Sequence, residues 1–120
     1  MKKILYVEDD RINAFVLTKL LEDQFEIVVV VDGEKCLNQI QKQQYDLILM
    51  DINLGQGKMD GVQTMQKLKE MPAYQSTPVF AVTSYANPGD REKFLHQGFD
   101  AYFSKPVDKA RIVEAITNYD

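Results

Sequence analysis

The chain has few of the features that mark disulfide-rich, secreted or membrane-spanning proteins. It has 120 residues, with one cysteine, no tryptophan and one histidine. The single Cys36 cannot form an internal disulfide, which fits a reducing cytosol. No apolar run approaches the roughly 20 residues that cross a bilayer. In the N-terminal stretch MKKILYVEDD, acids follow a short apolar run, unlike in a secretory signal. We therefore expect a cytoplasmic protein without a membrane partner.

A run of basic residues is also missing. The net charge is −4, which argues against nucleic acid as a direct partner. Hydrophobic residues make up 45% of the chain and charged residues 27%, as in soluble globular proteins. The length predicts a single domain over residues 1–120. We interpret Cys36 as a small core residue rather than a nucleophile, and His96 as a surface residue.

What the sequence does contain is an alternation of short apolar runs with helix-spaced segments. The runs are continuous and rich in aliphatic and aromatic residues, which is typical of parallel strands buried on both faces. They are ILYV (4–7), IVVVV (27–31), LILM (47–50), VFAV (79–82) and AYF (101–103). Helical spacing predicts five apolar stripes. These are Ile12, Phe15, Val16, Leu20 and Leu21; Cys36, Leu37 and Ile40; Val62, Met65, Leu68 and Met71; Phe94 and Leu95; and Ile112, Val113 and Ile116.

Helix boundaries can also be predicted. Asn87 is expected to cap a helix whose first residue is Pro88. Gly98 suits a left-handed C-cap, and Asp32 and Asp108 are predicted N-caps. The order is strand–helix repeated five times, without a linker or repeat. Right-handed crossovers and two covered faces predict a doubly wound α/β fold. Five strands suit the flavodoxin-like order 2-1-3-4-5, which is in part supplied by the resemblance described below rather than by the pattern itself.

In that order, polar side chains gather at the carboxyl ends of the strands. They are Glu8, Asp9 and Asp10 after the first strand, Asp51 after the third, Thr83 and Ser84 after the fourth, and Ser104 and Lys105 after the fifth. Two charges about 4 Å apart repel by roughly 4 kcal/mol at an effective dielectric of about 20. A hard cation with oxygen ligands, Mg²⁺, relieves that repulsion. Lys105 and a hydroxyl would complement an anion, and Asp51 could act as a nucleophile that forms an aspartyl-phosphate.

At this point the sequence resembles the response-regulator receiver domains of two-component signalling, including chemotaxis regulators. The segments that carry the resemblance are ILYVEDDRINAFVL, YDLILMDINL, MDGVQ, VFAVTSYA and DAYFSKPV. The resemblance implies a regulatory phosphoacceptor domain rather than an enzyme, although one that promotes its own phosphotransfer and dephosphorylation. The donor would be a sensor histidine kinase or a histidine phosphotransfer protein. The cofactor would be Mg²⁺, with Mn²⁺ able to substitute, and an unidentified downstream protein would be the target.

The resemblance also implies a role for each matching acid. Asp51 would be the phosphoacceptor and a metal ligand. Asp9 would bind the metal directly, Glu8 would bind it through water, and Asn53 would offer its backbone carbonyl. Asp10 lies one position beyond the acidic pair, and we interpret it as the N-cap of the first helix.

Further residues match the phosphoryl and switch positions of the family. Lys105 would pair with the phosphate, Thr83 would bond a phosphoryl oxygen, and Ser84 is suitably small. Pro106 is expected to follow a cis bond. Tyr102 matches the aromatic switch, with an ordinary core aromatic as the alternative, and strand alternation makes Phe103 the better core candidate. Thr83 and Tyr102 would together switch the face formed by the fourth helix, fifth strand and fifth helix.

Two features bear on the lifetime of a phosphorylated state. Tyr85 and Asn53 are expected to flank the path of an attacking water, next to Ser84, with a Tyr85 that only packs on the surface as the alternative. The loop NLGQGKMDG departs from the family pattern because it is longer and holds Gly55 and Gly57 instead of a proline. The two glycines make this loop more flexible, and its effect on metal or partner binding stays open.

Other functions fit less well. A haloacid-dehalogenase-type phosphatase needs a second acid where this chain has Asn53, and a dinucleotide-binding domain needs a glycine-rich turn where it has EDDRIN. The remaining alternative is a protein-interaction module with the same fold that works without phosphorylation. A stand-alone regulator, a relay intermediate and a receiver excised from a hybrid kinase fit the sequence equally.

Overall fold

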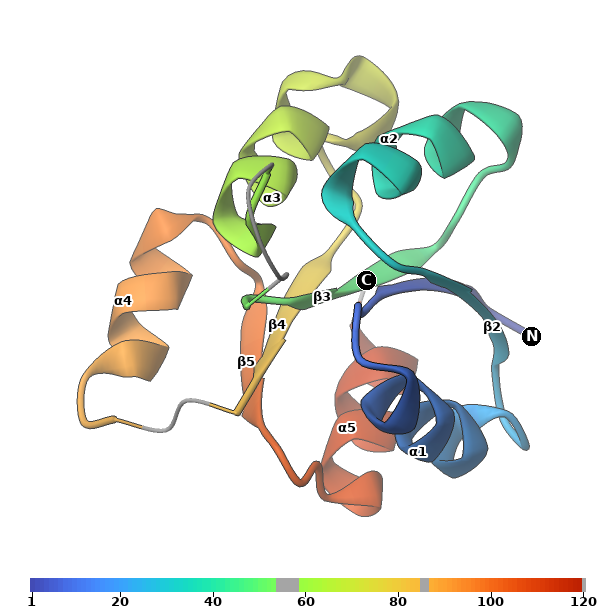
Figure 1. The fold of residues 1–120 in the computed structure, drawn as a ribbon, viewed down its shortest axis with the longest axis vertical. Coiled ribbons are helices and arrows are strands. Elements are labelled where there is room, and N and C mark those ends of the chain that lie inside the picture. Colours follow the sequence, from blue (N-terminus) through green and yellow to red (C-terminus); the bar gives the residue numbers. More distant parts are fainter. Residues whose placement is uncertain (54–58, 85–86, 120) are drawn as a thin grey trace.

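The computed structural model describes residues 1–53, 59–84 and 87–119. Strands and helices alternate along these residues (Figure 1). The strands are β1 (Lys3–Val7), β2 (Glu26–Val30), β3 (Leu47–Asp51), β4 (Val79–Thr83) and β5 (Ala101–Ser104). The helices are α1 (Arg11–Leu21), α2 (Gly33–Lys42), α3 (Gly61–Glu70), α4 (Asp90–Gln97) and α5 (Lys109–Asn118), and a short 3₁₀ helix spans Pro72–Tyr74.

The strands form one parallel sheet in the order β2-β1-β3-β4-β5, which confirms the predicted fold. Val7 of β1 pairs with Met50 of β3, and Asp51 pairs with Val82 of β4. This register brings the last residues of the three central strands to the same edge of the sheet. The residues that follow β1, β3 and β4 therefore lie next to one another.

Helices cover the sheet on both faces (Figure 1). One core cluster contains buried side chains of α2, α3 and α4, such as Cys36, Leu68 and Phe94. The other contains side chains of α1 and α5, such as Leu17 and Ile112. The central strands β1, β3 and β4 contribute to both clusters, so they are buried on both faces as predicted. Across the described residues, none of the helices has the length and apolar character needed to cross a bilayer.

Side-chain caps fix where most helices begin. The predicted caps Asp10, Asp32 and Asp108 accept hydrogen bonds from backbone N–H groups in the first turns of α1, α2 and α5. Asp60 forms a capping box with Gln63 at the start of α3. Each of these caps satisfies donors that have no partner within the helix.

The predicted cap at Asn87 is wrong. The α4 helix starts at Asp90, and its N-cap is Gly89 with φ 88°. The Asp90 N–H donates to the carbonyl of Asn87 at 3.1 Å, and the Asn87 N–H donates to Asp90 Oδ2 at 3.1 Å. A turn through Pro88 therefore precedes the helix, and only glycine adopts its positive φ without strain. At the other end, the predicted C-cap Gly98 has φ 125° and donates to the carbonyls of Phe94 and Leu95.

The predicted stripe on α1 is wrong at three of its five residues, while Leu20 and Leu21 pack against the core as predicted. Ile12, Phe15 and Val16 are 75%, 62% and 58% exposed, and the buried residues of α1 are Leu17 and Leu21. Leu17 and Leu21 are four residues apart and face the sheet. The sequence pattern mixed residues from two sides of the helix, because both sides are apolar. The outer side leaves a group of large apolar side chains in solvent.

The second strand departs from the predicted pattern as well. β2 begins at Glu26 rather than at Ile27, and Val29 and Val31 are exposed. β2 pairs only with β1, at the edge of the sheet. An edge strand lies at the margin of both helical layers, so its continuous apolar run is only half buried.

Candidate functional site

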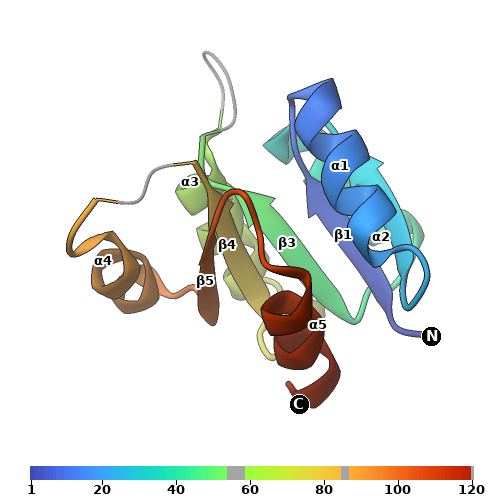
Figure 2. The same cartoon turned by 90° about the horizontal axis from the view of Figure 1, so that it is seen from below.

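The candidate site lies where the carboxyl ends of the central strands approach the start of α1, at the end of the sheet opposite the two termini (Figure 2). A cleft of about 450 Å³ opens there. The cleft is lined by Glu8, Asp9, Asp10, Asn13, Asp51, Asn53, Ser84 and Lys105. These residues follow β1, β3, β4 and β5, so the fold brings together side chains that are far apart in the sequence.

Three carboxylates meet in this cleft. Glu8 and Asp51 are buried and Asp9 is exposed. Each of the three offers an oxygen atom, and these oxygens lie within 4.8 Å of one another. Oxygen ligands of this kind, open to water on one side, suit a hard divalent cation such as Mg²⁺. The donor set therefore fits the predicted cofactor.

Lys105 is the cation that faces these carboxylates. Its Nζ lies 2.6 Å from Glu8 Oε1 and 3.6 Å from Asp51 Oδ2, so the pair with Glu8 is the closer one. The backbone N–H of Lys105 donates to the Thr83 carbonyl at 2.8 Å and ties this residue to the end of β4. The Lys105–Pro106 peptide bond is cis. Lys105 is thus held close to both strand ends rather than solvated at the surface.

The charges perturb one another. Burial, a hydrogen bond with Glu8 and repulsion from its charge raise the pKa of Asp51 to about 7. Burial alone would raise the pKa of Glu8 too, but hydrogen bonds from Asp51, Lys105 and Tyr6 outweigh that effect and lower it. Burial and the charge of Glu8 thus favour the protonated form of Asp51, whereas hydrogen bonds favour the charged form of Glu8.

The backbone around Asp51 is closely packed. The Asn53 N–H donates to Asp51 Oδ1 at 3.2 Å, and the Gly61 N–H donates to the carbonyl of Ile52 at 3.3 Å. A Cβ at Gly61 would clash with the Asp51 carbonyl oxygen. Gly61 therefore lets the start of α3 lie against the end of β3. Gly55 and Gly57 of the unusual loop fall in residues 54–58, outside the described residues.

Of the predicted switch residues, Thr83 is the last residue of β4 and Tyr102 lies on the neighbouring strand β5. Thr83 is fully buried, and Ser84 is exposed in the cleft. Tyr102 is half-buried and stacks on Phe94 of α4, with ring centroids 6.0 Å apart. Burial and the negative charge of Asp90 raise the pKa of Tyr102.

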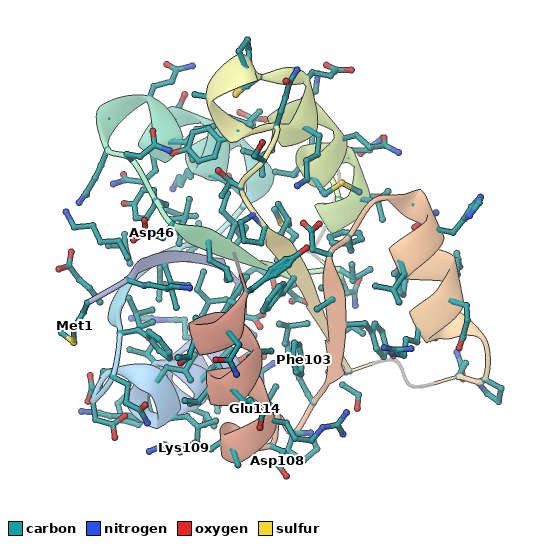
Figure 3. All side chains as sticks on the ribbon, turned by 180° about the vertical axis from the view of Figure 1, so that it is seen from behind. Met1, Asp46, Phe103, Asp108, Lys109 and Glu114 are labelled. Carbon is teal, nitrogen blue, oxygen red and sulfur yellow. The ribbon has the colours of Figure 1, made fainter. Side chains whose placement is uncertain are left out.

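Phe103 lies on the opposite face of β5, as predicted, and packs on Phe80 on the side that carries α5 (Figure 3). Tyr85, predicted to shield the acceptor, lies outside the described residues.

The sequence analysis missed three residues at the site, of which Asn13 of α1 lines the cleft. Tyr6 donates a buried hydrogen bond from its hydroxyl to Glu8 Oε1 at 2.8 Å. Strand alternation would have placed Tyr6 and Glu8 on one face, because they are two residues apart. Gly61 belongs to the MDGVQ segment, but the sequence alone does not show its close contact with Asp51, because that contact depends on how α3 packs.

Comparisons with known proteins agree with this geometry. The family model described as "Response regulator receiver domain" matches residues 4–117. The chain is 34% identical over 119 residues to the polar-differentiation response regulator DivK of Brucella anthropi. That match covers 98% of this chain and 95% of DivK. It is 33% identical over 117 residues to the signal transduction histidine-protein kinase BarA of Escherichia coli. That match covers 97% of this chain but only 12% of the length of BarA.

A solved structure gives the same picture. The receiver domain of the sensor histidine kinase PA1611 from Pseudomonas aeruginosa has a TM-score of 0.87 and 29% identity to this chain. The match covers 98% of this chain and 96% of that domain. That structure holds a magnesium ion coordinated in its active-site cleft.

The raised pKa of Asp51 predicts how stability depends on pH in metal-free protein. Asp51 binds a proton in the folded state between its ordinary pKa of 3.8 and about 7, where the unfolded state has lost it. The free energy of unfolding should therefore fall as the pH rises through this window. Asp51→Asn needs no proton, so it should raise the free energy of unfolding by roughly 4 kcal/mol at pH 8 and change it little at pH 4. Urea denaturation in EDTA measures both values, and equal pH slopes in the two proteins would contradict the assignment.

Proposed function

The chain belongs to the response regulator receiver domain family, and from this membership we propose that it accepts a phosphoryl group on Asp51 and switches partner binding in response. A receiver domain is a regulatory part of two-component signalling. The observation that carries the proposal is the buried Asp51 carboxylate, which lies close to the carboxylates of Glu8 and Asp9 and to the Lys105 ammonium. We assign residues 1–120 to one receiver domain, supported by the single five-stranded sheet.

The metal site would consist of Asp9 and Asp51 as direct ligands, the backbone carbonyl of Asn53, and Glu8 through water. Bound Mg²⁺, or Mn²⁺ in its place, would neutralise the carboxylates and the oxygens of an incoming phosphoryl group. The three carboxylate oxygens within 4.8 Å of one another support this assignment. The magnesium ion in the cleft of the PA1611 receiver domain supports it too.

In the transfer step, an Asp51 oxygen attacks the phosphorus atom of a phosphohistidine. The new oxygen–phosphorus bond forms as the phosphorus–nitrogen bond breaks, and the imidazole of the donor leaves. Lys105, 3.6 Å from Asp51, pairs with the phosphoryl oxygens, and Thr83 donates its hydroxyl to one of them. Ser84 is small enough to leave the phosphoryl group accessible.

Hydrolysis of the phosphorylated Asp51 would take place at the same open side of the cleft. A water attacks the phosphorus, the bond to the Asp51 oxygen breaks, and inorganic phosphate leaves. Asn53 is exposed at the site and its amide cannot take a proton from that water. We therefore propose a slow loss of phosphate, with Tyr85 as a further shield.

The central test is labelling by a small phosphodonor such as acetyl phosphate. Wild type should be labelled only when Mg²⁺ is present, and Asp51→Asn should not be labelled because an amide is no competent nucleophile. Asp32→Asn is the matched control, because Asn still caps α2 and the residue lies outside the cleft. Labelling of Asp51→Asn at the wild-type rate would refute the site. An unlabelled, folded wild type would instead favour the phosphorylation-independent interaction module.

We further propose that Thr83 and Tyr102 couple phosphorylation to the face formed by α4, β5 and α5. Thr83 is buried at the end of β4, and its carbonyl holds the Lys105 N–H. When Thr83 is drawn toward the phosphoryl group, space opens that Tyr102 can fill by leaving Phe94.

Thr83→Ala should therefore still bind the phosphoryl analogue beryllium fluoride but shift the α4–β5–α5 face much less. Amide NMR shifts measure this response, and Thr64→Ala, a buried threonine on α3, is the control. Equal shifts of that face in wild type and Thr83→Ala would contradict the coupling.

The phosphodonor is proposed to be a protein that docks on α1. Ile12, Phe15 and Val16 form an exposed apolar group on the helix that starts at the cleft. Val16 also lines an apolar cleft of about 220 Å³ that reaches Lys105. Exposed apolar groups of this kind mark protein–protein contacts, and this one lies beside the acceptor.

Phe15→Ala should slow transfer from a histidine kinase that labels the wild type by about tenfold, because exposed aromatics dominate such interfaces. Labelling by acetyl phosphate should stay within about twofold of wild type, since this donor needs no docking surface. Timed transfer of radiolabel measures both rates. An equal loss with both donors would place the effect in the site instead of the interface.

A further inference from the structure

Tyr6 contributes a buried hydroxyl to a strand that is otherwise aliphatic. The residue is 1% exposed, and its ring packs in the core cluster shared with α1 and α5. Burying a hydroxyl is costly unless it forms a hydrogen bond. Its bond goes to the carboxylate of Glu8, two residues later on the same face of β1.

We propose that Tyr6 is a positioning residue that holds the Glu8 carboxylate in place to receive the metal ion. This inference rests on the proposed Mg²⁺-dependent function. Tyr6 itself lies beneath the site and does not line the acidic cleft. It would act only through Glu8.

The contacts of Glu8 support this role. Oε1 accepts hydrogen bonds from the Tyr6 hydroxyl at 2.8 Å and from Lys105 Nζ at 2.6 Å. Oε2 accepts from the backbone N–H of Asp10 at 3.2 Å. Both oxygens are therefore fixed, and the carboxylate keeps one orientation beside Asp9 and Asp51. A metal site gains affinity when partners outside the ligand shell orient its ligands.

Tyr6 and Lys105 differ in one respect. Lys105 is shared between Glu8 and Asp51 and has a flexible side chain, so it can turn toward a phosphoryl group. The Tyr6 ring is packed in the core and cannot follow. When Lys105 leaves Glu8, the Tyr6 hydroxyl stays on Oε1, and the buried oxygen keeps a donor. Tyr6 thus secures Glu8 both before and during phosphorylation.

The test compares Mg²⁺ affinity in Tyr6→Phe and in the wild type. Phenylalanine keeps the ring and removes only the hydroxyl, so the dissociation constant should rise about tenfold, within the range found for partners that orient metal ligands. Calorimetric titration with Mg²⁺ at one pH and ionic strength measures it directly. Tyr45→Phe is the matched control: Tyr45 is as buried, but its hydroxyl bonds Gln39 and Gln43, away from the cleft. It should change the affinity by less than about twofold.

Kinetics provide a second measurement. In labelling by acetyl phosphate, Tyr6→Phe should raise the Mg²⁺ concentration that gives half the maximal rate. The maximal rate at saturating Mg²⁺ should change far less, because Asp51 is intact. In a Glu8→Gln background, Tyr6→Phe should weaken Mg²⁺ binding no further, since Tyr6 acts through the carboxylate.

Three results would overturn the role of Tyr6. The first is an unchanged Mg²⁺ dissociation constant in Tyr6→Phe. The second is an equal loss of Mg²⁺ affinity in Tyr45→Phe. The third is that Tyr6→Phe weakens Mg²⁺ binding in a Glu8→Gln background as much as it does in the wild type. If one of these results is found and the wild type binds Mg²⁺ normally, the proposed function stands and only the role of Tyr6 fails. A folded wild type that binds no Mg²⁺ would instead refute both.

Discussion

The repulsion between Glu8 and Asp51 is the interaction on which the arrangement of the site depends. Both carboxylates are buried at neighbouring strand ends, and neither can move away because each continues a central strand. The repulsion is relieved in two ways, because Lys105 pairs with both carboxylates and the raised pKa of Asp51 favours its protonated form. Both are replaceable, because a divalent cation can displace the proton and a phosphoryl group can attract the lysine. A site held by replaceable charges is prepared to bind a cation and an anion together.

The fold could be predicted because its signals are local and repeated. Five apolar runs and intervening helical spacings define the elements, and right-handed crossovers leave few ways to arrange them. The errors arose where neighbouring elements decide. On α1, residues on two sides are apolar, and only packing against the sheet selects Leu17 and Leu21. At Asn87, a turn that ends in Gly89 competes with a side-chain cap, and the sequence motif fits both.

The site could be predicted as a set of residues but not as a set of interactions. The strand order alone was enough to predict that Glu8, Asp51 and Lys105 lie near one another, because each stands at the end of a strand. The pKa of each carboxylate depends on its burial and on the hydrogen bonds and charges around it. Tyr6 was hidden for a related reason. A tyrosine in an apolar run is predicted to be a core residue, and Tyr6 is one. Its hydroxyl, however, also donates a hydrogen bond to the Glu8 carboxylate.

The position of β5 is the structural basis of the proposed coupling between the site and the surface of α4. Lys105 follows β5 directly, and its N–H bonds the Thr83 carbonyl at the end of β4. Tyr102 and Phe103 leave the same strand toward opposite helical layers, one against Phe94 of α4 and the other against Phe80 on the side of α5. Strands in a sheet move little, since each is bonded to its neighbours. In the proposed switch, a pull on Lys105 would be taken up by side chains, and Tyr102 is the one that contacts α4, through its stacking on Phe94. One short segment of chain therefore carries both Lys105, which pairs with the carboxylates of the site, and Tyr102, which contacts α4.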